Sequence, residues 1–197
     1  MKVIELGASS LCSIESIYNI KNVVKQFENN NKQILLIVPS LCWIDDILKS
    51  SAILASKGDV SYKVSLSTIQ RRHFSLIEGL LTRDDNEKVI SLLENLYSEL
   101  SDKFSDIYKR KNISKEELNS ISKYGSKAMT IIVNMIIDNS VIIENNNSLE
   151  AKNNQLYKVL IIANGEEFYK KNSKLIINSL NNNLENKNIT YYPQLAI

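Results

Sequence analysis

Cysteine and histidine are scarce in this sequence, and long apolar runs are missing. Two cysteines and one histidine among 197 residues make no disulfide framework and leave too few ligands for a metal site. The longest apolar stretch, Met129 to Ile137, contains Thr130 and Asn134 and falls far below the roughly 20 residues that span a bilayer. At the N-terminus, Glu5 interrupts the apolar stretch before a secretory signal could form. We therefore expect a cytoplasmic protein without a membrane segment.

Neither sign of charge dominates the composition. The chain has 24 basic and 22 acidic residues, which give a net charge of +2, and its lysines are dispersed without interleaved aromatic residues. This distribution does not favour nucleic acid as a partner, because nucleic acid binding needs a basic surface. Hydrophobic residues make up 44% of the chain, which is enough for one well-buried core but little for two at this length. We expect a single domain over residues 1–197.

The first residues predict a strand, a tight turn and a helix. Val3, Ile4 and Leu6 predict a short buried strand, and Gly7 with the small residues up to Ser10 predicts a tight turn. Ser13 is a suitable N-cap for a helix whose apolar residues recur three and four positions apart up to Phe27. Backbone N–H groups and the helix dipole converge at such a turn, which suits a phosphate. A plain connection between strand and helix explains the same residues, because the glycine spacing of nucleotide-binding loops is missing.

The rest of the chain alternates between strand and helix patterns. Gln33 to Pro39 contains a nearly continuous apolar run, typical of a strand that is buried on both faces. Ser114 and Glu117 form the capping box of a long helix. The further predicted elements are helices at Trp43–Ser56, Leu66–Leu81, Asn86–Lys109, Ser114–Asp138 and Ser173–Leu184, and strands at Val141–Ile143, Tyr157–Ala163 and Ile189–Tyr192. This order indicates an α/β fold, a three-layer αβα sandwich with a mainly parallel sheet and a helical insertion at about residues 66–138.

Five segments carry motifs in a consistent order. Met1 to Asn22 resembles a Lys-Phe-Gly-Gly-Thr-Ser strand and turn, and Leu36 to Leu48 resembles a strand with a Ser-Ala-x-x-Gly-x-Thr-Asn/Asp loop. Arg72 to Leu76 resembles an Arg-His-Leu helix, Ile121 to Met135 a helix with Phe-Gly-Glu-Arg-x-Ser, and Leu175 to Ile197 a helix and strand before a Gly-Phe-Ile-Gly turn. By these motifs the chain resembles the front half of the aspartokinases, in the amino acid kinase family. The resemblance implies the amino-acid-binding lobe alone, without the nucleotide lobe and the ACT domains.

The resemblance also implies that the residues for phosphoryl transfer have changed. Glu5 stands where the family has a lysine that stabilises charge on the transferring phosphoryl group, so it would repel that group. Ile44 takes the position of a substrate-contacting threonine, and Ser126 takes that of the glutamate that receives the substrate ammonium. We therefore expect no catalytic residues, and we do not expect the ATP and Mg of the family as cofactors. The ligand-binding positions implied by the resemblance are Gly7, Ala8, Ser9, Ser10, Asp45, Gly125 and Ser126.

Two classes of function are compatible with these residues. The first, which we favour, is a non-catalytic aspartokinase-like protein that binds a small ligand or a partner chain through the changed pocket. The C-terminal strand at Ile189–Tyr192 and the helix at Ser173–Leu184 would then lie at an interface with a second copy or another protein, because a bare sheet edge is a liability. The second class is an enzyme, either an aspartate kinase completed by a nucleotide lobe on another chain or an enzyme that uses the changed pocket for a different reaction.

Three titratable side chains have structural explanations. His73 is interpreted as a helix-surface or helix-packing residue and not as a general base, because no Ser, Cys or Asp partner is indicated. Asp45 and Asp46 are adjacent, and adjacent residues on a helix point about 100° apart. We therefore interpret them as capping the start of a helix and not as a carboxylate pair.

Cys12, Cys42 and Trp43 also follow predicted strands. Cys12 and Cys42 could approach each other at the C-terminal edge of a parallel sheet, but small buried hydrophobic residues are the default interpretation of free cysteines. Trp43 could cover a ligand, although packing in the core is the more frequent use of a tryptophan at this position.

Overall fold

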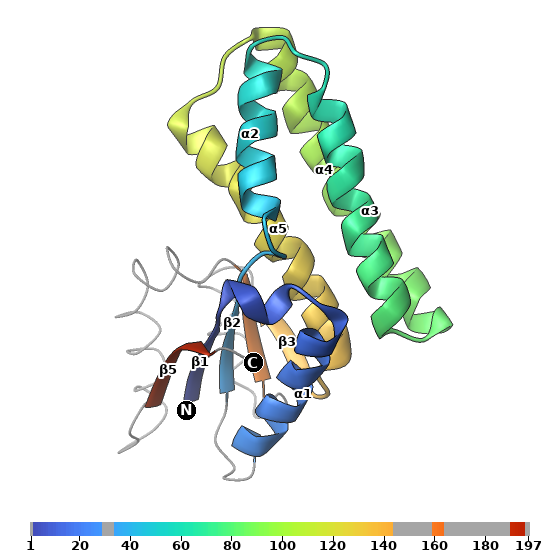
Figure 1. The fold of residues 1–197 in the computed structure, drawn as a ribbon, viewed down its shortest axis with the longest axis vertical. Coiled ribbons are helices and arrows are strands. Elements are labelled where there is room, and N and C mark those ends of the chain that lie inside the picture. Colours follow the sequence, from blue (N-terminus) through green and yellow to red (C-terminus); the bar gives the residue numbers. More distant parts are fainter. Residues whose placement is uncertain (1, 29–33, 144–158, 164–189, 196–197) are drawn as a thin grey trace.

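One parallel sheet forms the base of the molecule (Figure 1). The computed structural model describes residues 2–28, 34–143, 159–163 and 190–195. Its sheet has five strands in the order β3-β4-β2-β1-β5, and all neighbouring pairs run parallel. The strands are β1 (Lys2–Leu6), β2 (Ile34–Val38), β3 (Ser140–Ile143), β4 (Val159–Ala163) and β5 (Thr190–Leu195). The predicted α/β class with a parallel sheet is therefore confirmed.

The central strand, β2, is apolar along its whole length. All of its residues are buried, and it pairs with β1 on one side and with β4 on the other. Leu36 lies opposite Ile4 on one neighbour and opposite Ile161 on the other. A strand in this position is covered on both faces and paired on both edges, so consecutive apolar residues stabilise it. The continuous apolar run of the sequence therefore predicted its central place correctly.

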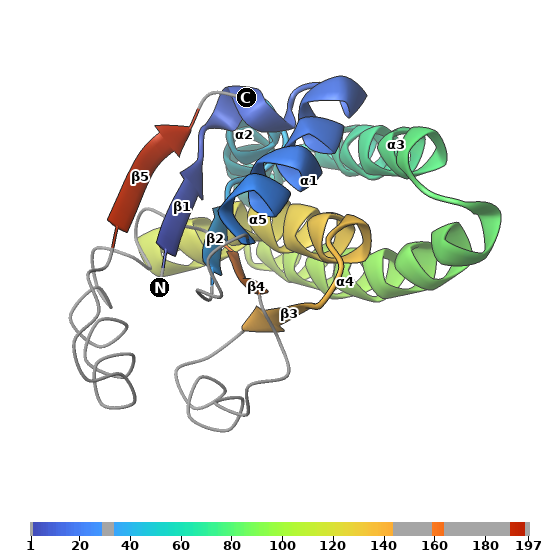
Figure 2. The same ribbon diagram turned by 90° about the horizontal axis from the view of Figure 1, so that it is seen from below.

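The helices of the described residues lie over one face of the sheet and extend beyond it. In Figure 2, α1 and α5 lie on the same side of the strands, and α5 contacts β2, β3 and β4. From there α2, α3, α4 and α5 form a helical column that rises away from the sheet (Figure 1). The helices are α1 (Ile14–Glu28), α2 (Ile44–Ser56), α3 (Tyr62–Leu80), α4 (Arg83–Arg110) and α5 (Lys115–Ile136). The column contains the predicted helical insertion, whereas the helix predicted at residues 173–184 lies outside the described residues.

α3 and α4 both start earlier than predicted. α3 starts at Tyr62 and not at Leu66, because the buried Tyr62 ring stacks on the ring of Phe104 in α4, with 5.6 Å between the ring centroids. This contact joins distant residues whose pairing cannot be read from the local pattern. α4 starts at Arg83 and not at Asn86. There the Thr82 hydroxyl donates to the Asp85 carboxylate at 2.8 Å across the first turn, a local contact.

α4 buries one stripe of residues and leaves its other faces to solvent. The buried residues recur three or four positions apart, as expected for one face of a helix: Val89, Leu93, Tyr97, Leu100, Phe104 and Ile107. The stripe packs against α2, α3 and α5, so α4 holds the helical column together.

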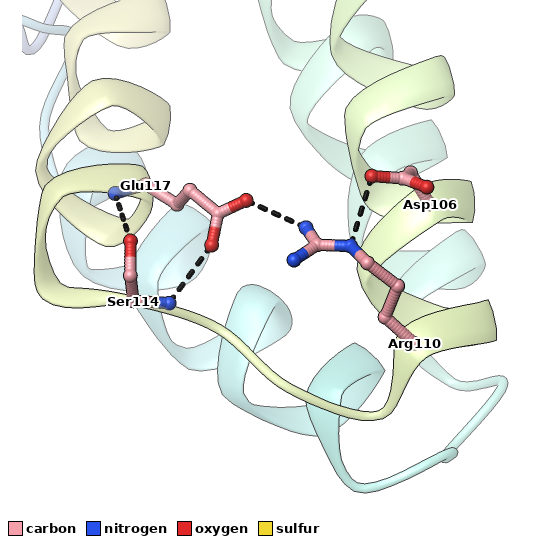
Figure 3. Close-up of polar contacts among 4 residues, drawn as sticks. All are labelled: Asp106, Arg110, Ser114 and Glu117. Carbon is pink, nitrogen blue, oxygen red and sulfur yellow. Dashed lines mark hydrogen bonds and ion pairs between the residues drawn. The ribbon is translucent and has the colours of Figure 1, made fainter.

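Polar side chains fix the turn between α4 and α5 (Figure 3). The Ser114 hydroxyl accepts from the Glu117 N–H at 3.1 Å, and the Glu117 carboxylate accepts from the Ser114 N–H at 2.8 Å, which confirms the predicted capping box. Arg110 donates to Asp106 at 3.0 Å and to Glu117 at 2.6 Å. Exposed ion pairs add little stability, but a helix cap contributes about 1 kcal/mol. The cap therefore defines where α5 begins.

His73 lies inside the helical column. Its side chain is fully buried, its Nδ1–H donates to the carbonyl of Ile69 at 2.9 Å, and its ring centroid is 6.0 Å from that of Tyr97. Its Nε2 has no hydrogen-bond partner among the described residues. Burial lowers the pKa of His73 to about 4, and the positive charge of Arg72 acts in the same direction. The helix-packing interpretation is confirmed, and the surface interpretation is wrong.

We expect the free energy of unfolding to decrease as the pH falls from about 6.5 towards about 4. In this range the unfolded chain binds a proton at His73 that the folded chain excludes, so acid favours the unfolded state. Between pH 8 and pH 5 the loss from His73 amounts to about 2 kcal/mol. Urea unfolding at both pH values measures this loss in the wild type and in His73→Leu, which should lack it. The same pH dependence in both proteins would contradict a buried neutral histidine.

Candidate functional site

The carboxyl ends of β1 and β2 bring the predicted site segments to one edge of the sheet. Ligands of open α/β sheets bind outside the carboxyl ends of the strands. Because β1 and β2 are parallel neighbours, the connections that follow them leave the same edge. The connection after β1 contains Gly7 to Ser10, and the connection after β2 leads through Ser40 into α2.

The connection after β1 is a single turn of 3-10 helix, η1 (Ala8–Leu11). Gly7 is its N-cap and has an extended backbone, and the N–H of Ser10 donates to the Gly7 carbonyl at 3.0 Å. Ser9 is exposed, whereas Ser10 is buried. Of the serines predicted to bind a ligand, only Ser9 therefore has an exposed side chain.

α1 begins at Ile14, after this turn has ended. The hydroxyl of Ser13 accepts from the N–H of Ser16 at 3.1 Å, so the predicted N-cap is confirmed. The turn and the N-terminus of α1 are nevertheless separate features, because η1 lies between Gly7 and the first residue of α1. A plain connection between strand and helix accounts for this geometry, and phosphate binding at the turn stays a prediction.

Glu5 lies on β1, just before this turn. It pairs in register with Ile37 of β2 and is half-buried, whereas its chain neighbours Ile4 and Leu6 are buried. The structure therefore places an acidic residue at the end of the strand that leads into Gly7.

The start of α2 brings a carboxylate into the protein interior. Ile44 is fully buried, while Asp45 and Asp46 occupy the first turn, where negative charge is favourable for the helix dipole. Neither aspartate forms a capping hydrogen bond, because the N-cap residue is Trp43. Burial raises the pKa of Asp45, and a hydrogen bond with Ser40 and the charge of Lys49 oppose this shift. The Oδ1 atom of Asp45 is buried and has no hydrogen-bond partner among the described residues.

Gly125 brings α5 into direct contact with the connection after β2. A Cβ atom at Gly125 would lie 2.8 Å from Ser40 Cβ, 2.9 Å from Asp45 Oδ1 and 3.0 Å from Ile44 Cγ2. These distances leave no space between the two segments. The structure thus brings together Ile44, Asp45 and Gly125, which the sequence analysis had placed at one site, and it adds Ser40, which the sequence analysis had missed.

Ser126 follows Gly125 but does not open onto a cavity. Its side chain is 2% exposed, and its hydroxyl donates to the Lys123 carbonyl of its own helix at 3.0 Å. One turn later, the Thr130 hydroxyl donates in the same way to the Ser126 carbonyl at 2.7 Å. Both hydroxyl groups satisfy backbone groups within α5, so the Ser126 side chain is used inside its helix.

Cys12 and Cys42 form a disulfide across the two connections. Their Cα atoms are 5.2 Å apart, within the range that a disulfide bridges. Cys12 is exposed and Cys42 is half-buried. The interpretation of both cysteines as small buried hydrophobic residues is therefore wrong. The alternative, that they approach each other at the C-terminal edge of the sheet, is confirmed, because β1 and β2 are parallel neighbours.

Trp43 is exposed and has an unusual backbone. Its side chain is 75% exposed, so the expectation that it packs in the core is wrong. Its φ of 69° lies in the left-handed region, which costs a residue other than glycine about 1–2 kcal/mol. Strained backbone of this kind concentrates at functional positions.

Metal ligands do not gather at this edge. Among the described residues, no group of three or more His, Cys, Asp or Glu side chains could hold a metal ion. The helices within the described ranges are also too short or too polar to cross a membrane. The site therefore consists of two strand-end connections, one bridge between them and the contact with α5.

Comparison with solved structures gives a likeness of fold. The chain is similar to the crystal structure of aspartate kinase from Clostridium acetobutylicum, with a TM-score of 0.56 and 15% sequence identity over 82% of this chain. The chain spans 38% of the length of that enzyme. No protein-family model matches the sequence, and no curated protein matches it. This similarity supports the predicted aspartokinase-like fold. At 15% sequence identity it supports the fold alone and not the activity.

We expect Gly125→Ala to destabilise the protein by about 1–3 kcal/mol, because the added Cβ would press on Ser40, Ile44 and Asp45. Gly79→Ala is the matched control in α3. Its Cβ would meet only the side chain of Ile14, which is 39% exposed and can turn away. There the helix preference of alanine should stabilise by about 0.5–1 kcal/mol. Urea unfolding measures both changes, and a Gly125→Ala protein as stable as the wild type would contradict the close contact.

Proposed function

We propose that the chain is an aspartokinase-like protein without kinase activity that acts as a ligand- or partner-binding module. The observation that carries this proposal is the contact of Gly125 with Ser40, Ile44 and Asp45. By the aspartokinase resemblance, the substrate amino acid would bind beside Ser126, next to this contact. This proposal is supported by the close contact at Gly125, and by the hydrogen bond of the Ser126 hydroxyl to its own helix, which leaves the ammonium group without the carboxylate that the family offers.

Glu5, at the end of β1, also supports the proposal. Phosphoryl transfer needs positive charge at the phosphates, because the transition state carries several negative charges. Glu5 is half-buried at the end of β1, in the position of the family lysine, and a carboxylate there disfavours a nucleotide phosphate. ATP and Mg are accordingly not proposed as cofactors.

The proposal extends to the organisation of the whole chain. We propose that residues 1–197 form one amino-acid-kinase-like lobe, in a cytoplasmic protein that associates with a second copy or another protein through its C-terminal strand. β5 lies at an edge of the sheet, where it pairs with β1 alone among the described strands. Unpaired strand edges are surfaces at which other chains bind.

An aspartate kinase completed by a second chain is the alternative. It rests on the likeness of fold to the Clostridium enzyme. In this case a separate protein would supply the nucleotide lobe, and mixing the two chains would produce ATP-dependent phosphorylation of aspartate. A neighbouring reading frame that encodes such a lobe would favour this alternative.

We expect the purified chain to release no ADP and to form no aspartyl phosphate from aspartate, ATP and Mg²⁺. Hydroxylamine trapping of the acyl phosphate measures the product, with the Clostridium aspartate kinase as the positive control. Glu5→Lys should stay at background as well, because restoring one positive charge does not open the contact at Gly125.

Product formation that elutes with the chain through purification, and that falls with the folded fraction in Gly125→Ala, would contradict the proposal. Activity that separates from the chain during purification would instead come from a contaminating kinase.

A further inference from the structure

The disulfide joins the two connections that make up the candidate site. Cys12 directly follows η1, and Cys42 directly precedes Trp43, the N-cap of α2. β1 and β2, which precede these connections, are parallel neighbours in the sheet, and the two cysteine Cα atoms lie 5.2 Å apart. The two cysteines are therefore placed to bond whenever they are oxidised, without a rearrangement of the backbone.

The bridge lies at the surface. Cys12 is exposed, Cys42 is half-buried, and the adjacent Trp43 side chain is 75% exposed. Exposed disulfides exchange with small thiols, whereas buried structural disulfides resist them. The protein has no other cysteines, so neither partner can exchange within the chain.

We propose that Cys12 and Cys42 form a reversible redox latch, which small thiols open and small disulfides close. The latch ties the connection after β1 to the start of α2 and so controls how freely both segments of the candidate site move. This inference does not depend on the absence of kinase activity.

Closure proceeds by two thiol–disulfide exchanges. The Cys12 thiolate attacks one sulfur of a small disulfide such as oxidised glutathione, whose S–S bond breaks and releases one thiol. The Cys42 thiolate then attacks the Cys12 sulfur of the mixed disulfide and releases the second thiol. The two protein thiols lose two electrons and two protons, and the small disulfide takes them up. Opening is the reverse, with Cys12 attacked first because it is the exposed sulfur.

The bridge constrains a substantial part of the chain. It joins residues 30 positions apart and encloses α1 and β2 in the loop that it closes. Closing a loop of this length restricts the unfolded chain, so the oxidised protein should melt about 5–15 °C higher than the reduced protein. Hydrogen exchange should increase on reduction in residues 8–13 and 40–44, next to the bridge, and stay unchanged in the buried stripe of α4.

The test equilibrates the full wild-type chain in glutathione buffers that range from fully reduced to fully oxidised. The samples are quenched with acid, alkylated and weighed by mass spectrometry. The expected result is a reversible change between a form with two alkylated thiols and a form with none. Trp43 is the only tryptophan and adjoins Cys42, so its fluorescence should follow the same transition and stay constant in a Cys12→Ser/Cys42→Ser double variant.

Single variants test the order of the exchanges. Cys42→Ser should accumulate one glutathione on Cys12, because the residue that resolves the mixed disulfide is missing. Cys12→Ser is the matched control, and its half-buried Cys42 should react about tenfold more slowly. Equal rates would overturn the assignment of Cys12 as the attacked residue. Circular dichroism checks that each single variant is folded. The wild-type glutathione titration tests the latch even if a single variant does not fold.

Three results would overturn the latch itself. In the first, both thiols remain reactive to alkylation in fully oxidised glutathione. In the second, the disulfide of the native protein is not reduced by excess dithiothreitol, so that it is a permanent structural disulfide. In the third, a non-reducing gel shows a disulfide between two chains in place of the disulfide within one chain.

Discussion

The close approach of α5 to the start of α2 is the contact on which the rest of the structure depends. Among the described helices, α5 belongs both to the helical column and to the face of the sheet, where it contacts β2, β3 and β4. Gly125 makes this possible, because even a methyl group there would lie within 3.0 Å of Ser40, Ile44 and Asp45. A glycine in the middle of a helix costs about 1 kcal/mol relative to alanine. The chain tolerates this cost where the column joins the sheet.

The same contact determines what the sheet edge can do. It buries the Asp45 carboxyl and raises its pKa, and it directs the Ser126 hydroxyl back into its own helix. Trp43, in the connection after β2, is exposed beside the bridge between Cys12 and Cys42. We therefore propose that a small ligand binds near this exposed surface and not in the position that the aspartokinase resemblance implies for an amino acid, while a partner chain binds at the sheet edge formed by β5.

Local patterns in the sequence predicted the features that depend on neighbouring residues. The apolar run of β2 indicated a central strand, and Ser114 with Glu117 indicated the start of α5. Features that depend on distant residues were missed. The early start of α3 relies on Phe104 of α4, and the exposure of Trp43 follows from a left-handed backbone that no periodicity reveals. Cys12 and Cys42 were predicted in part. Their positions after two parallel strands indicated that they could approach each other, but the sequence alone did not distinguish a disulfide from two buried free cysteines.

The most direct measurement of the central claim is an NMR titration of the labelled full chain with aspartate, followed at the backbone amides of Asp45, Gly125 and Ser126. If the contact between α5 and α2 is closed, these signals stay in place while aspartate is raised to millimolar concentration, and the Gly125 amide keeps its slow hydrogen exchange. Saturable shifts at these amides, together with faster exchange at Gly125, would show that the contact opens to admit an amino acid and would contradict the account.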